Sequence, residues 1–148
     1  MKSYKEIKVA YHNDVARAHP LCDIEGGDWV DLYTAEDVDM YAGQYKEISL
    51  GVSIQLPAGH EAIVAPRSST FKKWGLLCAN SIGIIDNAYC GENDVWKFPA
   101  ICMKTNVHIP AGTRICLFRI FRNMSAHEFL TVSKTGKKSR GGFGSTGD

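Results

Sequence analysis

EISLGVSIQL, residues 47–56, places an apolar side chain at every second position. The apolar members of this series are Ile48, Leu50, Val52, Ile54 and Leu56. Successive side chains of an extended chain point to opposite faces, so this alternation predicts a strand with one face on a core. The strand should end at 57–59, Pro-Ala-Gly, because proline fixes φ and glycine permits the turn to close.

Similar signals along the chain predict further short strands. A second Pro-Ala-Gly turn, at 110–112, precedes another apolar run, TRICLFRIF. Only residues 68–74 are predicted to form a helix. It is short, Ser68 or Ser69 can cap it, and Gly75 can end it. Many short strands separated by turns indicate an all-β fold, a sandwich or barrel in one domain. Apart from the two apolar runs, the predicted strands are 7–11, 29–34, 61–65, 76–80, 95–103 and 128–132.

The composition is typical of a soluble globular domain. Of the 148 residues 45% are hydrophobic and 22% are charged, and the formal net charge is +1. A net charge this close to zero gives no overall electrostatic attraction to nucleic acid. No stretch of the sequence is long and apolar enough to span a bilayer. The five cysteines contain no C-x-x-C pair, which predicts free thiols in a reducing compartment and neither a disulfide framework nor a zinc site. We therefore expect a cytoplasmic protein that contacts neither membrane nor nucleic acid directly.

Two short segments carry residue types that could perform chemistry. In 66–70, Pro-Arg-Ser-Ser-Thr, a guanidinium, hydroxyls and free backbone N–H groups meet at a helix start, which suits a phosphate chain. The alternative is an ordinary helix cap beside a solvated arginine. In 83–92, GIIDNAYCGE, Asp86 follows a strand, where a carboxylate could orient a water molecule as general base, and Tyr89 offers a flat face to a sugar or base. The alternative is a hairpin whose aspartate only bonds its own loop.

The C-terminal segment 134–148, KTGKKSRGGFGSTGD, is rich in glycine, serine and basic residues. This composition is typical of a flexible segment, so we expect a β domain over 1–133 and a C-terminal strap over 134–148. Phe143 has no local core to join, and glycines allow backbone to approach a phosphate. A lid that stacks Phe143 on a base is the functional alternative.

Together these segments resemble the five motifs of the trimeric dUTPase family, in the family's order. The stretch before the third motif also carries Asn80, as the family does. DWVDL, AEDV and GENDVW further resemble the subgroup found in Gram-positive bacteria and their phages. The matching segments are 27–35 with acidic Asp31, 66–69, 83–92, 112–116 and 141–147.

The resemblance implies a jelly-roll-like homotrimer whose active sites are shared between subunits, and the hydrolysis of dUTP to dUMP and pyrophosphate. Mg²⁺ would lie on the triphosphate with waters completing its shell, one of them held by Asp31, and no side chain would bind the metal directly. Asp86 would act as general base toward the water that attacks the α-phosphorus. Tyr89 would lie under the deoxyribose and exclude a 2′-hydroxyl. Phosphates would be held by Arg67, Ser68, Ser69, Arg140, Ser145 and Thr146, and uracil by Asn80, Gly83, Ile85, Phe143 and Gly144.

The chain departs from the family's pattern at a few positions. Leu117 stands where the fourth motif usually has a glutamine, so an amide near the α-phosphate is missing. In the fifth motif Lys138 occupies the usual arginine position, so either Lys138 or Arg140 could contact phosphate. Ala88 and Cys90 replace an Asp and an Arg or Gln of the third motif without touching Asp86 or Tyr89.

Two further functions are alternatives. A dCTP deaminase shares the fold, but its glutamate would fall near Trp96 and Lys97, where this chain has no carboxylate. A phage-type regulatory dUTPase would keep the nucleotide motifs and add a repressor protein as partner. A plain structural jelly roll would leave GGFGSTG unexplained.

Overall fold

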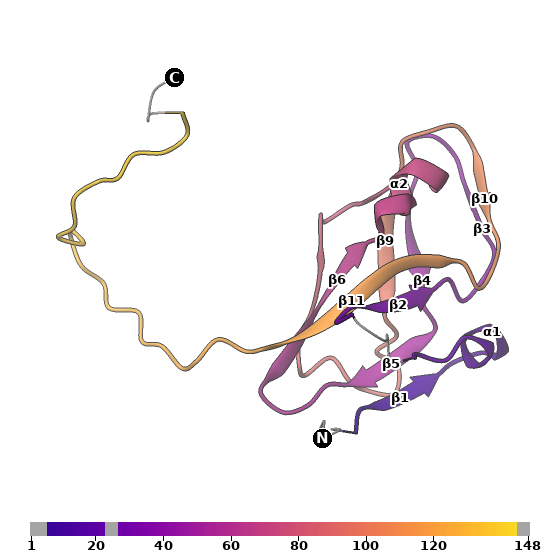
Figure 1. Ribbon diagram of the computed structural model, residues 1–148, viewed down its shortest axis with the longest axis horizontal. Coiled ribbons are helices and arrows are strands. Elements are labelled where there is room, and N and C mark those ends of the chain that lie inside the picture. Colours follow the sequence, from indigo (N-terminus) through magenta and orange to yellow (C-terminus); the bar gives the residue numbers. More distant parts are fainter. Residues whose placement is uncertain (1–5, 23–26, 145–148) are drawn as a thin grey trace.

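The computed structural model describes residues 6–22 and 27–144, and these form an antiparallel β domain followed by an extended C-terminal segment (Figure 1). The all-β prediction is therefore confirmed. The helices within the described residues are α1 (Asp14–Ala18) and α2 (Ser68–Trp74). The strands are β1 (Lys8–Tyr11), β2 (Val30–Tyr33), β3 (Val38–Met40), β4 (Tyr45–Ser49), β5 (Val52–Gln55), β6 (His60–Pro66), β7 (Leu76–Cys78), β8 (Gly83–Ile85), β9 (Lys97–Cys102), β10 (Val107–Ile109) and β11 (Arg114–Arg122).

In the part of the chain that the structure describes, the strands pair in four antiparallel sheets around one core. The largest sheet has the order β2-β11-β6-β8, and the others are β4-β9-β7, β1-β5 and β10-β3. Every pairing joins strands that are distant in the sequence. The apolar faces of these sheets meet in a single cluster that includes Leu32, Ile54, Phe98 and Ile115. The sheet β2-β11-β6-β8 is the one that carries most of the residues expected to act on a ligand.

The stretch 47–56 buries its alternating apolar residues as predicted, but it does not form a single strand. All five apolar side chains lie in the core. β4 pairs with β9, whereas β5 pairs with β1, so the chain changes sheets at Leu50 and Gly51. Gly51 has φ +66°, and a Cβ there would lie 2.8 Å from Ala35 Cβ and 2.9 Å from Ala16 Cβ. Only glycine fits at this crossing. Residues with a Cβ rarely adopt such a positive φ, and there is no room for a Cβ at position 51.

The prediction of a single helix was wrong, because α1 also forms. It has five residues, and the Asn13 side chain caps it by accepting a hydrogen bond from Ala16 N at 2.8 Å. One turn is too short to produce a helical hydrophobic period, so the pattern gave no signal. The helix at 68–74 is confirmed, and Gly75 ends it with φ +67°.

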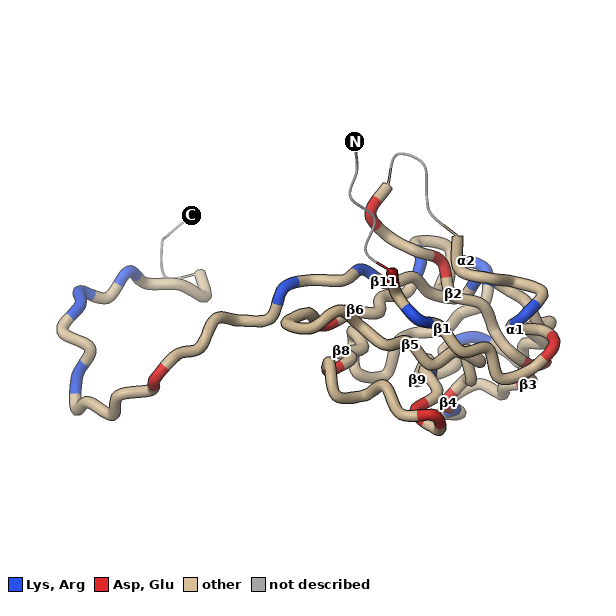
Figure 2. The backbone as a smooth tube through the Cα atoms, turned by 90° about the horizontal axis from the view of Figure 1, so that it is seen from below, with Lys and Arg blue, Asp and Glu red and all other residues tan. Residues whose placement is uncertain are grey.

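The strand predicted at 128–132 is also absent. Phe129 and Leu130 are largely exposed, and the residues described after Arg122 form neither helix nor strand. A strand needs a neighbour for its backbone hydrogen bonds, and this segment extends away from the β domain (Figure 1). Basic residues are spaced along it, as Figure 2 shows. No helix of the described residues is long and apolar enough to cross a membrane.

Candidate functional site

One group of expected site residues meets where β2, β11 and the start of α2 come together. Asp31 Oδ1 lies 3.3 Å from Arg67 Nε, and Asp31 Oδ2 lies 3.5 Å from Arg114 Nη1. Arg67 Nη1 also donates to the backbone carbonyl of Arg114 at 3.4 Å. The side chains of Asp31 and Arg67 are only 26% and 30% exposed, so this is a half-buried cluster of two cations and one anion. Its net positive charge suits an anionic ligand.

Two hydrogen bonds of the Thr70 hydroxyl, one local and one to β11, fix the position of Arg67. Arg67 is the N-cap of α2, and its backbone N–H donates to Thr70 Oγ1 at 2.9 Å. The buried Thr70 hydroxyl donates in turn to the Ile115 carbonyl of β11 at 2.7 Å. Ser68 or Ser69 was expected to cap the helix, and this was wrong, because Arg67 is the N-cap and Thr70 at the third helical position bonds its backbone. Their hydroxyls remain at the first turn, beside Arg67.

A second group lines a groove of about 330 Å³ along β8 and the turn that follows it. Asp86 comes directly after β8, and its Oδ1 accepts a hydrogen bond from Ala88 N at 2.8 Å. Asp86 Oδ2 has no partner among the described residues. Tyr89 closes the turn by donating from its backbone N–H to the Asp86 carbonyl, and its hydroxyl donates to the Val95 carbonyl at 3.3 Å. The other lining residues are Asn80, Gly83, Ile84, Ile85, Val95 and Pro99, with Glu47 and Lys97 as an ion pair.

The two groups lie at opposite ends of the same sheet. β8 pairs with β6 so that Ile85 is opposite Ala62, and Arg67 follows the other end of β6. Asp86 is therefore level with Glu61, which stands near the start of β6. At about 3.3 Å per residue of strand, the backbones of Asp86 and Arg67 are about 20 Å apart. A single chain does not bring the two groups to one phosphate.

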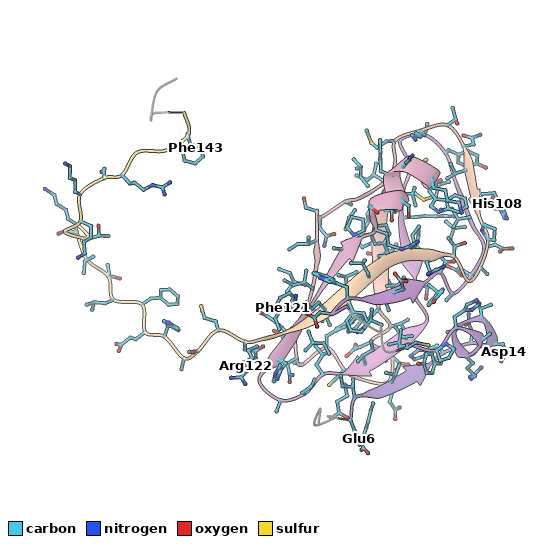
Figure 3. All side chains as sticks on the ribbon, viewed as in Figure 1. Glu6, Asp14, His108, Phe121, Arg122 and Phe143 are labelled. Atoms are coloured by element: carbon cyan, nitrogen blue, oxygen red, sulfur yellow. The ribbon has the colours of Figure 1, made fainter. Side chains whose placement is uncertain are left out.

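The C-terminal residues are not near either group in this structure. Phe143 is fully exposed and lies far from the β domain (Figure 3). Arg140 and Gly144 belong to the same extended segment, and neither lines the groove. Ser145 and Thr146 lie outside the described residues. This part of the expected site is therefore not assembled within one chain.

The described part of the chain contains neither a disulfide nor a cluster of side chains that could hold a metal ion by itself. The five cysteines form no disulfide, and no three His, Cys, Asp or Glu side chains of the described residues gather as metal ligands. Burial raises the pKa of the Cys116 thiol well above its usual range. Burial also raises the pKa of Cys78. Both thiols are therefore protonated and unsuited to act as nucleophiles.

Sequence reasoning missed several residues that the structure brings to these groups. Arg114 lies in the fourth family segment, and its position beside Asp31 could have been found from that motif. Glu47 and Lys97 come from β4 and β9 and reach the groove only through tertiary pairing. Asn87 contacts a distant turn, and nothing in the local sequence signals that contact.

Comparisons with known proteins identify the family of this chain and proteins that share its fold. The family model described as dUTPase matches residues 29–147. A prophage-derived deoxyuridine 5′-triphosphate nucleotidohydrolase of Bacillus subtilis is 44% identical over 142 residues, covering 96% of this chain and 98% of the relative. The solved dUTPase of Staphylococcus bacteriophage 80alpha, a point mutant with dUpNHpp, superimposes with a TM-score of 0.82 at 19% identity, over 98% of this chain and 100% of that chain.

A second phage structure has the same fold. The dUTPase of the Staphylococcus aureus phage phi11, an aspartate-to-asparagine point mutant described with a structural Mg(II) ion, superimposes with a TM-score of 0.74 at 16% identity, over 88% of this chain and 99% of that chain. The two phage structures show likeness of fold, while the family model and the Bacillus relative show descent. On these matches, the chain belongs to the dUTPase family.

Proposed function

We propose that this protein hydrolyses dUTP to dUMP and pyrophosphate, limiting uracil in DNA and supplying dUMP for dTMP synthesis. The observation that carries the proposal is the groove along β8, where a carboxylate with one unpartnered oxygen among the described residues, Asp86, lies beside an aromatic ring, Tyr89. That arrangement suits a nucleoside and a general base side by side. The nucleotidohydrolase of Bacillus subtilis supports the choice of substrate.

The roles of the groove residues follow from their chemistry. Asp86 Oδ2 accepts a proton from the water that attacks the α-phosphorus, and pyrophosphate leaves. Exposed backbone groups of 80–83 and the Ile85 strand end offer donors and acceptors that can match the uracil edge. The ring of Tyr89 lies against the deoxyribose and leaves no room for a 2′-hydroxyl. dUTP is then preferred over UTP for steric reasons.

The cluster at the start of α2 is assigned to the triphosphate. Arg67 provides a guanidinium, Ser68 and Ser69 provide hydroxyls, and the first turn of α2 provides backbone N–H groups. Asp31 orients the Arg67 guanidinium from 3.3 Å away. The Asp31 carboxylate would also hold one of the waters of a Mg²⁺ ion that lies on the phosphates, since Mg²⁺ gives up its waters reluctantly. Bound there, Mg²⁺ would neutralise charge on the phosphates.

The distance between the two groups supports a shared site. The backbones of Asp86 and Arg67 are about 20 Å apart along β6, which favours a site where one triphosphate meets Asp86 and Arg67 from different copies of the chain. We therefore propose a closed homotrimer, in which the third copy supplies the strap. In that assembly Phe143 covers uracil, while Arg140 or Lys138, Gly144, Ser145 and Thr146 reach the substrate. The free cysteines support a reducing, cytoplasmic location.

The decisive experiment measures pyrophosphate release with Mg²⁺ from dUTP, dCTP, dTTP and UTP. We expect release from dUTP alone. Ammonia release from dCTP is measured in parallel, because Glu47 places a carboxylate in the same groove and a deaminase would use one. Deamination of dCTP without hydrolysis of dUTP would overturn the proposal.

A variant pair then tests the general base. Asp86→Asn should lower kcat by about 10²–10⁴-fold, because the amide keeps the shape and removes the proton acceptor. Glu92→Gln is the matched control, since Glu92 is an exposed carboxylate of the same loop. A near wild-type rate for Asp86→Asn, with analogue binding intact, would show that Asp86 is not the base.

A further inference from the structure

The turn that presents Asp86 and Tyr89 is weakly supported by its own strand. β8 has three residues and lies at the edge of its sheet, paired only with β6 among the described strands. The bonds within the turn, Ala88 N to Asp86 Oδ1 and Tyr89 N to Asp86 O, fix its internal shape. They do not fix where the turn lies relative to the sheet. Besides the pairing of β8 with β6 and the 3.3 Å bond from the Tyr89 hydroxyl to the Val95 carbonyl, a contact with the body of the domain is needed to do so.

Asn87 makes that contact. Its Nδ2 donates to the Pro57 carbonyl at 2.8 Å and to the His60 carbonyl at 2.9 Å. These bonds cross 30 and 27 residues of sequence, and they use both hydrogens of the amide. Asn87 is half-buried, whereas Asp86, Ala88 and Tyr89 around it are more open to solvent or line the groove. The side chain therefore points back to the body of the domain while Asp86 and Tyr89 face the groove.

The turn at 57–60 is itself held in place by backbone hydrogen bonds. The His60 N–H donates to the Pro57 carbonyl at 3.1 Å, which closes the turn between β5 and β6. The Asn123 N–H donates to the Gly59 carbonyl at 2.9 Å, which ties the turn to the end of β11. The turn that carries the Pro57 and His60 carbonyls is thus attached both to β6, which it precedes, and to the end of β11.

We infer that Asn87 is a positioning residue for the reaction, acting through the placement of Asp86 and Tyr89 and not by touching substrate. This rests on the proposed function. A carboxylate acting as base has to lie within hydrogen-bonding reach of the attacking water, and a shift of about 1 Å can lower a rate by about 10²-fold. Asn87 keeps the two functional side chains at a fixed offset from β6.

The test compares Asn87→Asp and Asn87→Ala with wild type, using Asn93→Asp and Asn93→Ala as controls. Asp is nearly isosteric with Asn but cannot donate to two carbonyls, whereas Ala removes the contact. Asn93 is an exposed asparagine of the same loop and has no side-chain hydrogen bond within the described residues. Three quantities are measured: hydrogen exchange of the segment 86–90 by mass spectrometry, kcat and KM with dUTP, and Tm.

For both Asn87 variants we expect exchange in 86–90 to become about tenfold faster and kcat to fall about 10- to 100-fold, with Tm lowered by only a few degrees. The Asn93 variants should match wild type. Unchanged exchange in 86–90, or lost protection with an unchanged kcat, would overturn the inference. A kcat loss that merely follows the unfolded fraction would do so as well. Failure of wild type to hydrolyse dUTP would instead reject the proposed function, and the exchange measurement would still report whether Asn87 holds the turn.

Discussion

Asp31→Asn separates the structural role of the Asp31 cluster from its role on the ligand. The carboxylate lies 3.3 Å from Arg67 and 3.5 Å from Arg114, and the side chains of Asp31, Arg67 and Arg114 are 26%, 30% and 55% exposed. Water therefore screens both ion pairs, and each is worth roughly 0.2–1 kcal/mol. The two together contribute at most about 2 kcal/mol, which lowers Tm by up to about 8 °C in a domain of this size.

The effect on hydrolysis should be much larger than the effect on stability. The neutral amide introduced by Asp31→Asn could not hold both guanidiniums or a metal-bound water, and loss of such an orienting group typically costs about 10–100-fold in activity or metal affinity. Calorimetry gives Tm, and pyrophosphate release is titrated with Mg²⁺. Asp14→Asn is the control, because it breaks an exposed ion pair with Arg17 at 2.8 Å, far from the site.

Two results would refute this reasoning about Asp31. A rate within about twofold of wild type at every Mg²⁺ concentration would show that the carboxylate orients nothing the reaction needs. A Tm fall well beyond about 8 °C, with the rate reduced only in proportion to the folded fraction, would make the cluster a structural element.

Four further outcomes are expected. Tyr89→Ala should raise the rate with UTP relative to dUTP, and an unchanged ratio of kcat/KM would contradict the steric role. Deleting 139–148 should leave Tm and the oligomeric mass nearly unchanged while kcat falls steeply; equal turnover by the truncated protein would exclude a lid. Gly75→Ala should destabilise the fold by about 1–2 kcal/mol in denaturant unfolding, because φ is +67° and a Cβ would meet Lys104 at 2.6 Å. The hydrogen bond that His108 donates to the Asp39 carboxylate raises the pKa of His108, so wild type should exceed His108→Gln in stability below about pH 6.5 and lose that advantage as pH rises through the higher pKa.

Alternation and turn residues were enough to predict the class of fold. Burial of the five apolar residues in 47–56 and the two Pro-Ala-Gly turns are local consequences of the sequence. The change of sheet at Gly51 was not predictable, because it depends on which strands pair, and pairing is tertiary. The strand expected at 128–132 failed for the same reason: the segment has no neighbouring strand within the described part of this chain.

The candidate site likewise has a part that the local sequence predicts and a part that depends on tertiary pairing. Asp31, Arg67 and Asp86 could be identified from their motifs, each of which is a local pattern. Their grouping could not, because the register of β8 on β6 is what separates Asp86 from Arg67 by about 20 Å. Glu47, Lys97 and Asn87 belong to the groove or its support through contacts that no local pattern encodes.

The position of Leu117 shows what the register adds to a motif. Residues directly opposite each other in antiparallel strands share a face, and Leu117 is opposite Asp31 in β2 and Ala65 in β6. The place where the family usually has a glutamine is thus beside the Asp31 carboxylate. An apolar side chain there cannot donate a hydrogen bond to a phosphate. It also does not compete with Arg67 and Arg114 for the two oxygens of the Asp31 carboxylate.

In the proposed reaction, the phosphate chain near Asp31 must then be bound by Arg67, the first turn of α2 and Arg114. The Arg114 side chain is more than half exposed and already contacts this cluster. Arg114 is therefore the residue of the fourth motif that we expect to contact the phosphate chain in place of the glutamine that this chain lacks at position 117.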